Sequence, residues 1–141
     1  MFTEPLIKEN MSTSIPYTQC AQAIAQFYLS LDEGDTEGLL ACVASDTVWV
    51  RQGKTLTGPE EIRAALMERN PDRITSHQYS NLTVVLDEGG TSATATYYLT
   101  VYDNQHPAGG VQMKTILRSE DRFTLRDGRW LLAQKRSKKH L

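Results

Sequence analysis

The second half of the chain constrains the fold most, because nearly all of it is patterned as long β-strands. Residues 103–110, which are rich in Pro and Gly, predict a loop, and the Asp127-Gly128 step predicts a tight hairpin. The four predicted strands cover residues 77–86, 92–102, 111–125 and 129–135. Long strands joined by short connections predict an antiparallel meander.

The first half is patterned as helices around a short strand pair. Apolar residues at three- and four-residue steps predict a helix over residues 17–31. Asp35 is placed to cap a second helix, and Gly58 opens a third. Residues 47–50 and 54–56 predict strands between them. This order predicts an α+β fold, a cone-like curved antiparallel sheet with three N-terminal helices enclosing a pocket.

Composition excludes several classes of protein. With 141 residues, the chain suits one globular domain, and a net charge of −2 gives no electrostatic reason to expect nucleic acid. No apolar run approaches the roughly 20 residues of a membrane span, so no membrane is expected either. Cys20 and Cys42 have neither redox nor zinc spacing, which predicts reduced thiols and a cytoplasmic location.

The two ends differ from the predicted domain, which covers residues 16–136. Charged residues interrupt any signal-like apolar stretch near the start, and residues 1–15 are predicted to be disordered or extended. Residues 137–141 are predicted to form a basic, solvated tail. Contact of this tail with RNA or an anionic surface is the alternative.

Two residues are candidates for acid–base chemistry. Asp32 lies four residues after Tyr28, so the two share a helix face. His77 opens a predicted strand, where alternation places it on one face with Tyr79 and Asn81. A free imidazole has a pKa near 6.5, which suits a general base. Taken alone, the sequence favours an exposed or capping acid at Asp32 and a structural histidine at His77.

Other kinds of chemistry find no support in the sequence. It contains no GxSxG, no phosphate-binding glycine loop and no dinucleotide fingerprint. The three histidines have no metal-ligand spacing, so we predict neither a metal nor a cofactor. Proton abstraction followed by elimination or isomerisation fits that restriction.

Several short stretches together resemble the SnoaL-like branch of the nuclear-transport-factor-2-like superfamily. The resemblance covers about residues 17–136 and depends on the order and spacing of the stretches. They are residues 27–35, 46–49, 58–63, 75–81, 120–123 and 126–130. The resemblance implies a cone of curved strands closed by three helices over a deep apolar pocket. Relatives include scytalone dehydratase, hexachlorocyclohexane dehydrochlorinase, bile-acid dehydratase and the non-catalytic small subunits of ring-hydroxylating dioxygenases.

The resemblance also implies a catalytic pair. In the lyases of this family, an Asp at the end of the first helix pairs with a His that opens the strand region, and Asp32 and His77 stand at those positions. The carboxylate would fix the imidazole tautomer. A second group would assist the leaving group: Tyr28 is best placed, because it shares the helix face of Asp32, and Tyr98, Tyr102 and Arg126 are the alternatives. The predicted substrate-binding residues are Trp49, Tyr98, Tyr102, Met113 and Arg126.

Two departures narrow the function that is implied. Leu31 stands where scytalone dehydratase has a tyrosine, and the region of its second histidine, residues 97–103, has none here. The prediction is therefore a small cofactor-independent, dehydratase-like lyase or isomerase acting on an apolar cyclic molecule. The alternative is a non-catalytic small-molecule-binding or accessory subunit. An exposed sheet face predicts a homo-oligomer, a dimer or a trimer.

Overall fold

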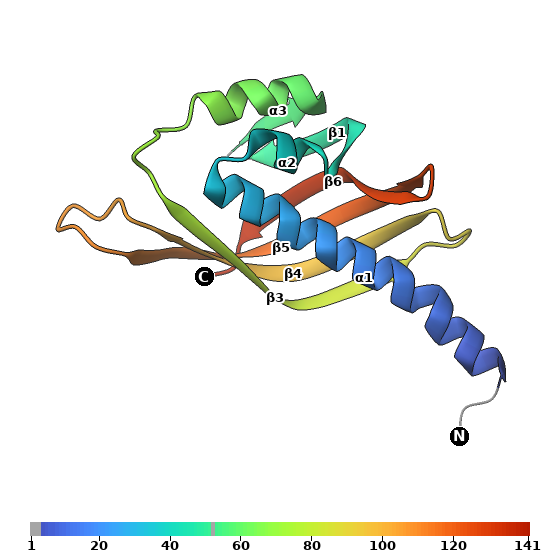
Figure 1. Cartoon of the computed structure of the whole chain (residues 1–141). Coiled ribbons are helices and arrows are strands. Elements are labelled where there is room, and N and C mark those ends of the chain that lie inside the picture. The colour runs from blue at the N-terminus through green and yellow to red at the C-terminus, as the bar shows by residue number, and fades with distance from the viewer. Residues whose placement is uncertain (1–3, 52) are drawn as a thin grey trace.

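The computed structural model describes residues 4–51 and 53–141, and it has the α+β architecture that the sequence predicts. Figure 1 shows the helices gathered on one side of a curved sheet. The elements are α1 Glu4–Glu33, α2 Thr36–Leu40, β1 Val43–Arg51, β2 Lys54–Thr57, α3 Gly58–Met67, β3 Thr75–Leu86, β4 Ser92–Asp103, β5 Gln112–Arg126 and β6 Arg129–Lys139.

The described strands form one six-stranded sheet in the order β2-β1-β6-β5-β4-β3. The predicted meander is confirmed, because β3 to β6 pair antiparallel in sequence order. β1, however, runs parallel to β6, with Val48 opposite Gln134. The sheet is therefore mixed: the curved antiparallel sheet that the sequence predicts is extended by one parallel pair, β1 and β6. A long stretch of chain separates β1 from β6, so no local turn sets their relative direction.

Local turn and cap chemistry behaves as predicted. Asp127 and Gly128 both have positive φ, 50° and 75°, and they close the hairpin between β5 and β6. Positive φ at both central residues is what a two-residue hairpin with the natural strand twist requires. The Asp35 carboxylate accepts a hydrogen bond from the backbone N–H of Gly38 at 2.9 Å, which caps α2.

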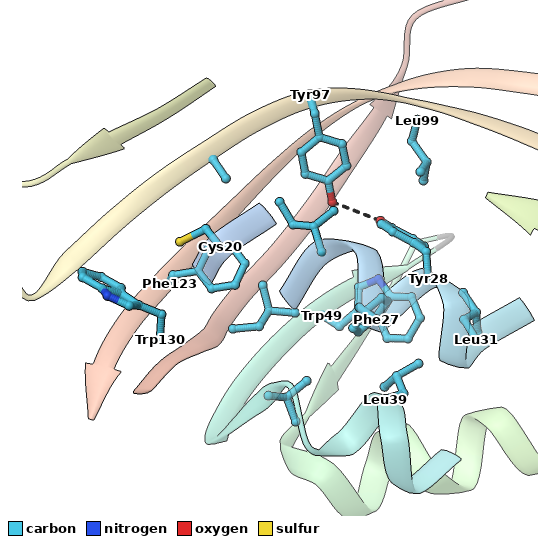
Figure 2. Close-up of a cluster of buried hydrophobic side chains, with 14 of the residues drawn as sticks. Cys20, Phe27, Tyr28, Leu31, Leu39, Trp49, Tyr97, Leu99, Phe123 and Trp130 are labelled. Carbon is cyan, nitrogen blue, oxygen red and sulfur yellow. Dashed lines mark hydrogen bonds between the residues drawn. The ribbon is translucent and has the colours of Figure 1, made fainter. Parts of the chain in front are cut away.

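The core lies between α1 and the inner face of the sheet. Every second residue of β4 from Ala93 to Asp103 is buried, and the residues between them are partly exposed. Figure 2 shows Phe27 of α1 near Trp49 of β1, and the two rings pack edge to face with centres 5.2 Å apart. This packing holds the last turns of α1 against the sheet, and α1 also contacts β3.

A bulge in β3 changes which side chains face the core. Asn81 has a φ of 57°, and the pairing register with β4 shifts between Ser80 and Thr83. His77 is partly buried, but Asn81 is exposed. The prediction that Asn81 shares the face of His77 is therefore wrong, because the extra residue of a bulge reverses the alternation beyond it.

Both ends are more ordered in secondary structure than the sequence suggests. α1 begins at Glu4 rather than near residue 17, so residues 4–15 are helical, and residues 1–3 lie outside the described residues. At the other end, β6 continues to Lys139, with Lys138 opposite Arg118 of β5. Most of the predicted tail, residues 137–139, is thus strand.

None of the described helices covers the outer face of the sheet, as Figure 1 shows. Along β4 this face presents partly exposed Thr and Tyr side chains. The homo-oligomer stays a prediction. None of the described helices is long and apolar enough to cross a membrane.

Candidate active site

Asp32 and His77 lie in direct contact where the last turn of α1 meets the start of β3. Asp32 Oδ1 is 2.6 Å from the ring Nδ1 of His77. Asp32 Oδ2 accepts the backbone N–H of His77 at 2.8 Å, and Thr75 Oγ1 donates to Oδ1 at 2.7 Å. The side chains of Asp32 and His77 are only 15% and 12% exposed. One carboxylate therefore fixes both the ring and the backbone of His77.

The environment of Asp32 favours its ionised form. Burial opposes ionisation, but the hydrogen bonds from the ring and backbone of His77 and from Thr75 outweigh it and lower the pKa of the Asp32 carboxyl. An ionised carboxylate only accepts hydrogen bonds, so the 2.6 Å contact requires a proton on Nδ1 of His77. In the neutral imidazole, the lone pair is then on Nε2, which has no hydrogen-bond partner among the described residues.

The lowered pKa of Asp32 predicts a pH-dependent contribution to stability. Because the folded-state pKa lies below the unfolded value, near 3.8, the ionised group stabilises the fold above that pH. The contribution is lost as the pH falls through the folded-state pKa. We expect Asp32→Asn to lower the free energy of unfolding by about 1–2 kcal/mol at neutral pH. Urea unfolding of the wild-type and Asp32→Asn proteins from neutral to acidic pH measures this loss. A difference in unfolding free energy that stays constant with pH would contradict the prediction.

A partly enclosed cavity of about 380 Å³ (the enclosed cavity) lies beside His77. Tyr28, which precedes Asp32 by one helical turn, forms part of its wall and stacks on the His77 ring with centres 5.2 Å apart. The apolar part of the wall consists of Leu31, Trp49, Val50, Leu99, Val101 and Leu117. Asp32 and His77 also border a more open groove of about 530 Å³ between α1 and β3. The enclosed cavity is the better reaction chamber, because it excludes more water.

A buried polar network that the sequence did not indicate reaches this cavity through Tyr28 and Lys135. Lys135 Nζ donates to Asp121 Oδ2 and to the hydroxyl of Tyr97, both at 2.8 Å, and to the hydroxyl of Tyr28 at 3.0 Å. Tyr97 also donates to Asp121 Oδ2 at 2.8 Å. In Figure 2 a dashed line joins the hydroxyls of Tyr28 and Tyr97, which are 3.1 Å apart. Three acceptors match the three protons of an ammonium group, so Lys135 is charged.

The charge state of this network follows from its contacts. Burial opposes the charge on Lys135, but Asp121 and Tyr28 outweigh it, so the pKa of Lys135 is raised. Burial also raises the pKa of Tyr28, which stays a neutral phenol. Asp121 Oδ1 is buried without a hydrogen-bond partner among the described residues. The network is thus a buried ion pair with two phenols attached.

The rim of the cavity is cationic. Arg51, Arg69, Arg73 and Lys114 all line it. Arg69 donates to the carbonyl of Leu31 at 3.0 Å and to Thr75 Oγ1 at 3.2 Å, which links it to the Asp32 carboxylate through Thr75. The sequence did not single out these residues, because they come from β1, from the segment between α3 and β3, and from β5. Only the fold brings them together.

The predicted substrate-binding residues divide into two groups. Trp49 lines the cavity. Tyr98 and Tyr102 do not, because β4 turns Tyr97 inward and alternation sends both of them to the outer face. There, Tyr98 lies against His140, with ring centres 4.7 Å apart, and Tyr102 pairs with Met113 of β5.

Met113 and Arg126 also lie away from the cavity. Met113 is 49% exposed, and its pairing with Tyr102 places it on the outer face. Arg126 stands beside the β5–β6 hairpin and makes a bidentate ion pair with Asp46 at 2.8 and 3.1 Å. In the part of the chain that the structure describes, no group of three or more His, Cys, Asp or Glu side chains could hold a metal ion.

Comparison with known proteins identifies the domain. The sequence profile of the SnoaL-like domain matches residues 14–136. No curated protein matches the chain in sequence.

Solved structures with the same fold include three informative ones. A protein from Catenulispora acidiphila in complex with S-DNPA is 25% identical, with a TM-score of 0.75 over 89% of this chain and 94% of that chain. The hexachlorocyclohexane dehydrochlorinase LinA-type3 from Novosphingobium barchaimii LL02 is 13% identical, with a TM-score of 0.82 over 94% and 91%. ActVI-ORFA from Streptomyces coelicolor is 18% identical, with a TM-score of 0.74 over 88% and 96%.

Proposed function

The chain belongs to the SnoaL-like domain family, and on that premise we propose that it is a cofactor-independent lyase or isomerase with His77 as general base. The observation that carries the proposal is the 2.6 Å contact between Asp32 Oδ1 and His77 Nδ1 beside an enclosed cavity. The shared fold with a dehydrochlorinase supports elimination chemistry, and the relative in complex with S-DNPA supports a small organic ligand.

The proposed base step uses the free nitrogen of His77. Nε2 takes a proton from a carbon of the substrate, and the C–H electron pair forms a double bond to the neighbouring carbon. The leaving group on that neighbour departs with its bonding electrons. Asp32 stabilises the imidazolium that forms and keeps the ring in the reactive tautomer. A general base of this kind contributes a factor of about 10²–10⁴ to the rate.

Tyr28 is the proposed acid for a poor leaving group such as hydroxide. Its raised pKa keeps it protonated, so it can give its proton to the departing oxygen and release water. Lys135 Nζ, 3.0 Å from the phenol oxygen, stabilises the phenolate that remains. The proton on His77 then returns to Tyr28 through solvent, which leaves the enzyme unchanged. The overall reaction removes one C–H hydrogen and one hydroxyl group as water.

The test is a screen of cyclic β-hydroxy and β-halo ketones with the wild-type protein in D₂O. We expect at least one to exchange its α-proton, followed by ¹H NMR, and to give a conjugated product, followed by its ultraviolet absorbance. If the ketones that bind undergo neither proton exchange nor elimination, the proposal is contradicted. That outcome would favour the alternative, a non-catalytic small-molecule-binding or accessory subunit.

A further inference from the structure

We propose that the ligand of the enclosed cavity is an organic carboxylate, whose ring lies against the apolar wall and whose carboxylate is bound by Arg51 at the cationic rim. This inference deepens the proposed function. It rests on that function in one respect only, the claim that the bound acid is also the substrate. The sequence predicted an apolar cyclic ligand. Such a ligand fits the apolar wall of the cavity but does not account for the cations of its rim.

The charges around the cavity do not balance. Five cationic side chains line it, and no carboxylate is among the lining residues. Asp121 compensates Lys135, and Asp103 Oδ2 accepts from Arg73 Nε at 3.1 Å. Within the described part of the chain, Arg51 forms no ion pair with any carboxylate, and Lys114 forms none either. Asp103 also interacts electrostatically with Lys114, and Asp32 with Arg69. Among the described residues, no carboxylate contributes to the electrostatics of Arg51, so the positive charge of the cavity is least compensated at this residue.

Arg51 is the cation most clearly placed to receive an anion. Its guanidinium lies over the Trp49 ring, 5.0 Å from the ring centre, so its orientation is fixed before any ligand arrives. Burial and the neighbouring Arg69 and Arg73 lower the pKa of Arg51. A bound anion would relieve both the desolvation and the like-charge repulsion. The planar fork of a guanidinium also matches the two oxygens of a carboxylate.

Arg69 provides a second, independent observation. Its Nε is buried and has no hydrogen-bond partner among the described residues, while Nη1 and Nη2 make one hydrogen bond each. Such orphaned donors are rare in folded proteins and cost stability unless something accepts from them. A carboxylate in this cavity supplies acceptor oxygens next to the residues that hold the Asp32–His77 pair.

The test compares two ligands of nearly the same shape that differ in charge. Isothermal titration calorimetry measures the binding of 2-naphthoate and of its neutral analogue, 2-naphthamide. We expect the wild-type protein to bind the acid at least about tenfold more tightly than the amide, since a charge-assisted hydrogen bond exceeds a neutral one by about that factor. Added NaCl should weaken the binding of 2-naphthoate and leave the affinity for 2-naphthamide unchanged.

Variants then locate the effect. Arg51→Gln should lower the affinity for 2-naphthoate about tenfold and leave the affinity for 2-naphthamide unchanged. Arg51→Lys should retain part of the preference for the acid over the amide. The matched control is Arg118→Gln, which removes the same charge from an exposed position on β5 outside the cavity. Equal affinity for the two ligands, an Arg51→Gln protein that binds the acid as wild type does, or failure of 2-naphthoate to bind at millimolar concentration would each overturn the inference.

A further variant separates this inference from the proposed function. Asp32→Asn disrupts the catalytic pair but leaves Arg51 and its ring contact in place. If this variant keeps the preference for the acid while the wild-type protein catalyses no elimination, the carboxylate site stands and the lyase proposal fails. If the wild-type protein eliminates from neutral ketones but shows no preference for the acid, the lyase proposal stands and the carboxylate site fails.

Discussion

Replacing Lys135 by methionine is expected to lower the free energy of unfolding by about 3–5 kcal/mol at neutral pH. Lys135 and Asp121 are fully enclosed, with side chains 3% and 1% exposed. Methionine keeps the length of the side chain but leaves a buried carboxylate without its cation. The two phenols also lose the ammonium that donates to them. Urea unfolding followed by circular dichroism measures the change.

The loss in Lys135→Met should depend on pH. Burial already raises the pKa of Asp121, and Lys135 and Tyr97 oppose that rise. Without Lys135 the folded-state pKa rises further above the unfolded value. A carboxyl of this kind stabilises the fold when protonated, and this contribution is lost as the pH rises through the folded-state pKa. The deficit relative to wild type should therefore shrink as the pH falls from 8 toward 5.

Two comparison variants identify the buried pair as the cause. Arg136→Met changes the next residue, whose ion pair with Glu120 is at the surface, and should cost less than about 1 kcal/mol. The double variant Lys135→Met/Asp121→Leu removes both charges and should lose clearly less stability than Lys135→Met alone. A single variant that unfolds like wild type, or a double variant that is less stable than the single one, would contradict the explanation.

The second large effect concerns catalysis. For any substrate found in the screen, His77→Gln is expected to lower kcat/KM by about 10²–10⁴, with KM close to wild type. Glutamine is similar in size and can still donate to Asp32, but it cannot take a proton at neutral pH. The side chain of His77 borders the cavity, and glutamine can keep the hydrogen bond to Asp32, so we expect the main loss in the chemical step. Steady-state rates of product formation measure it.

The control for His77→Gln is the adjacent residue of the same strand. Gln78 is exposed on the other face of β3, so Gln78→Ala should retain wild-type kcat/KM. Equal unfolding midpoints for wild type and His77→Gln would show that the loss of rate is not a loss of folded protein. A His77→Gln protein with more than about a tenth of the wild-type kcat/KM would contradict the role of His77 as base.

Much of the fold could be predicted because its signals are local. The positive φ at Asp127 and Gly128, the capping carboxylate of Asp35 and the alternation in β4 each depend on a few neighbouring residues. The candidate pair, by contrast, could be named only from the family resemblance. The acid and the histidine are 45 residues apart, and no local pattern links them.

Lys135 shows why the rest of the site could not be predicted. Trp130 and Leu132 of β6 are buried, so strict alternation would turn Gln134 inward and Lys135 outward. The pairing with β5 shifts at this point: Phe123 lies opposite Leu132, but Arg122 lies opposite Gln134. The extra residue reverses the faces and sends Lys135 into the core. A register shift is a property of two paired strands, and one strand's sequence does not contain it.

The sequence by itself thus determined the order of the helices and strands, the main turns between them, and the α+β class, since these depend on propensity and periodicity over short windows. The tertiary structure alone decided that β1 runs parallel to β6, that Tyr97 rather than Tyr98 faces the core, and that the cations of three separate segments meet at one cavity. Each of these depends on which surfaces pack together. Side chains far apart in the chain become neighbours only when burial of apolar surface brings their elements into contact.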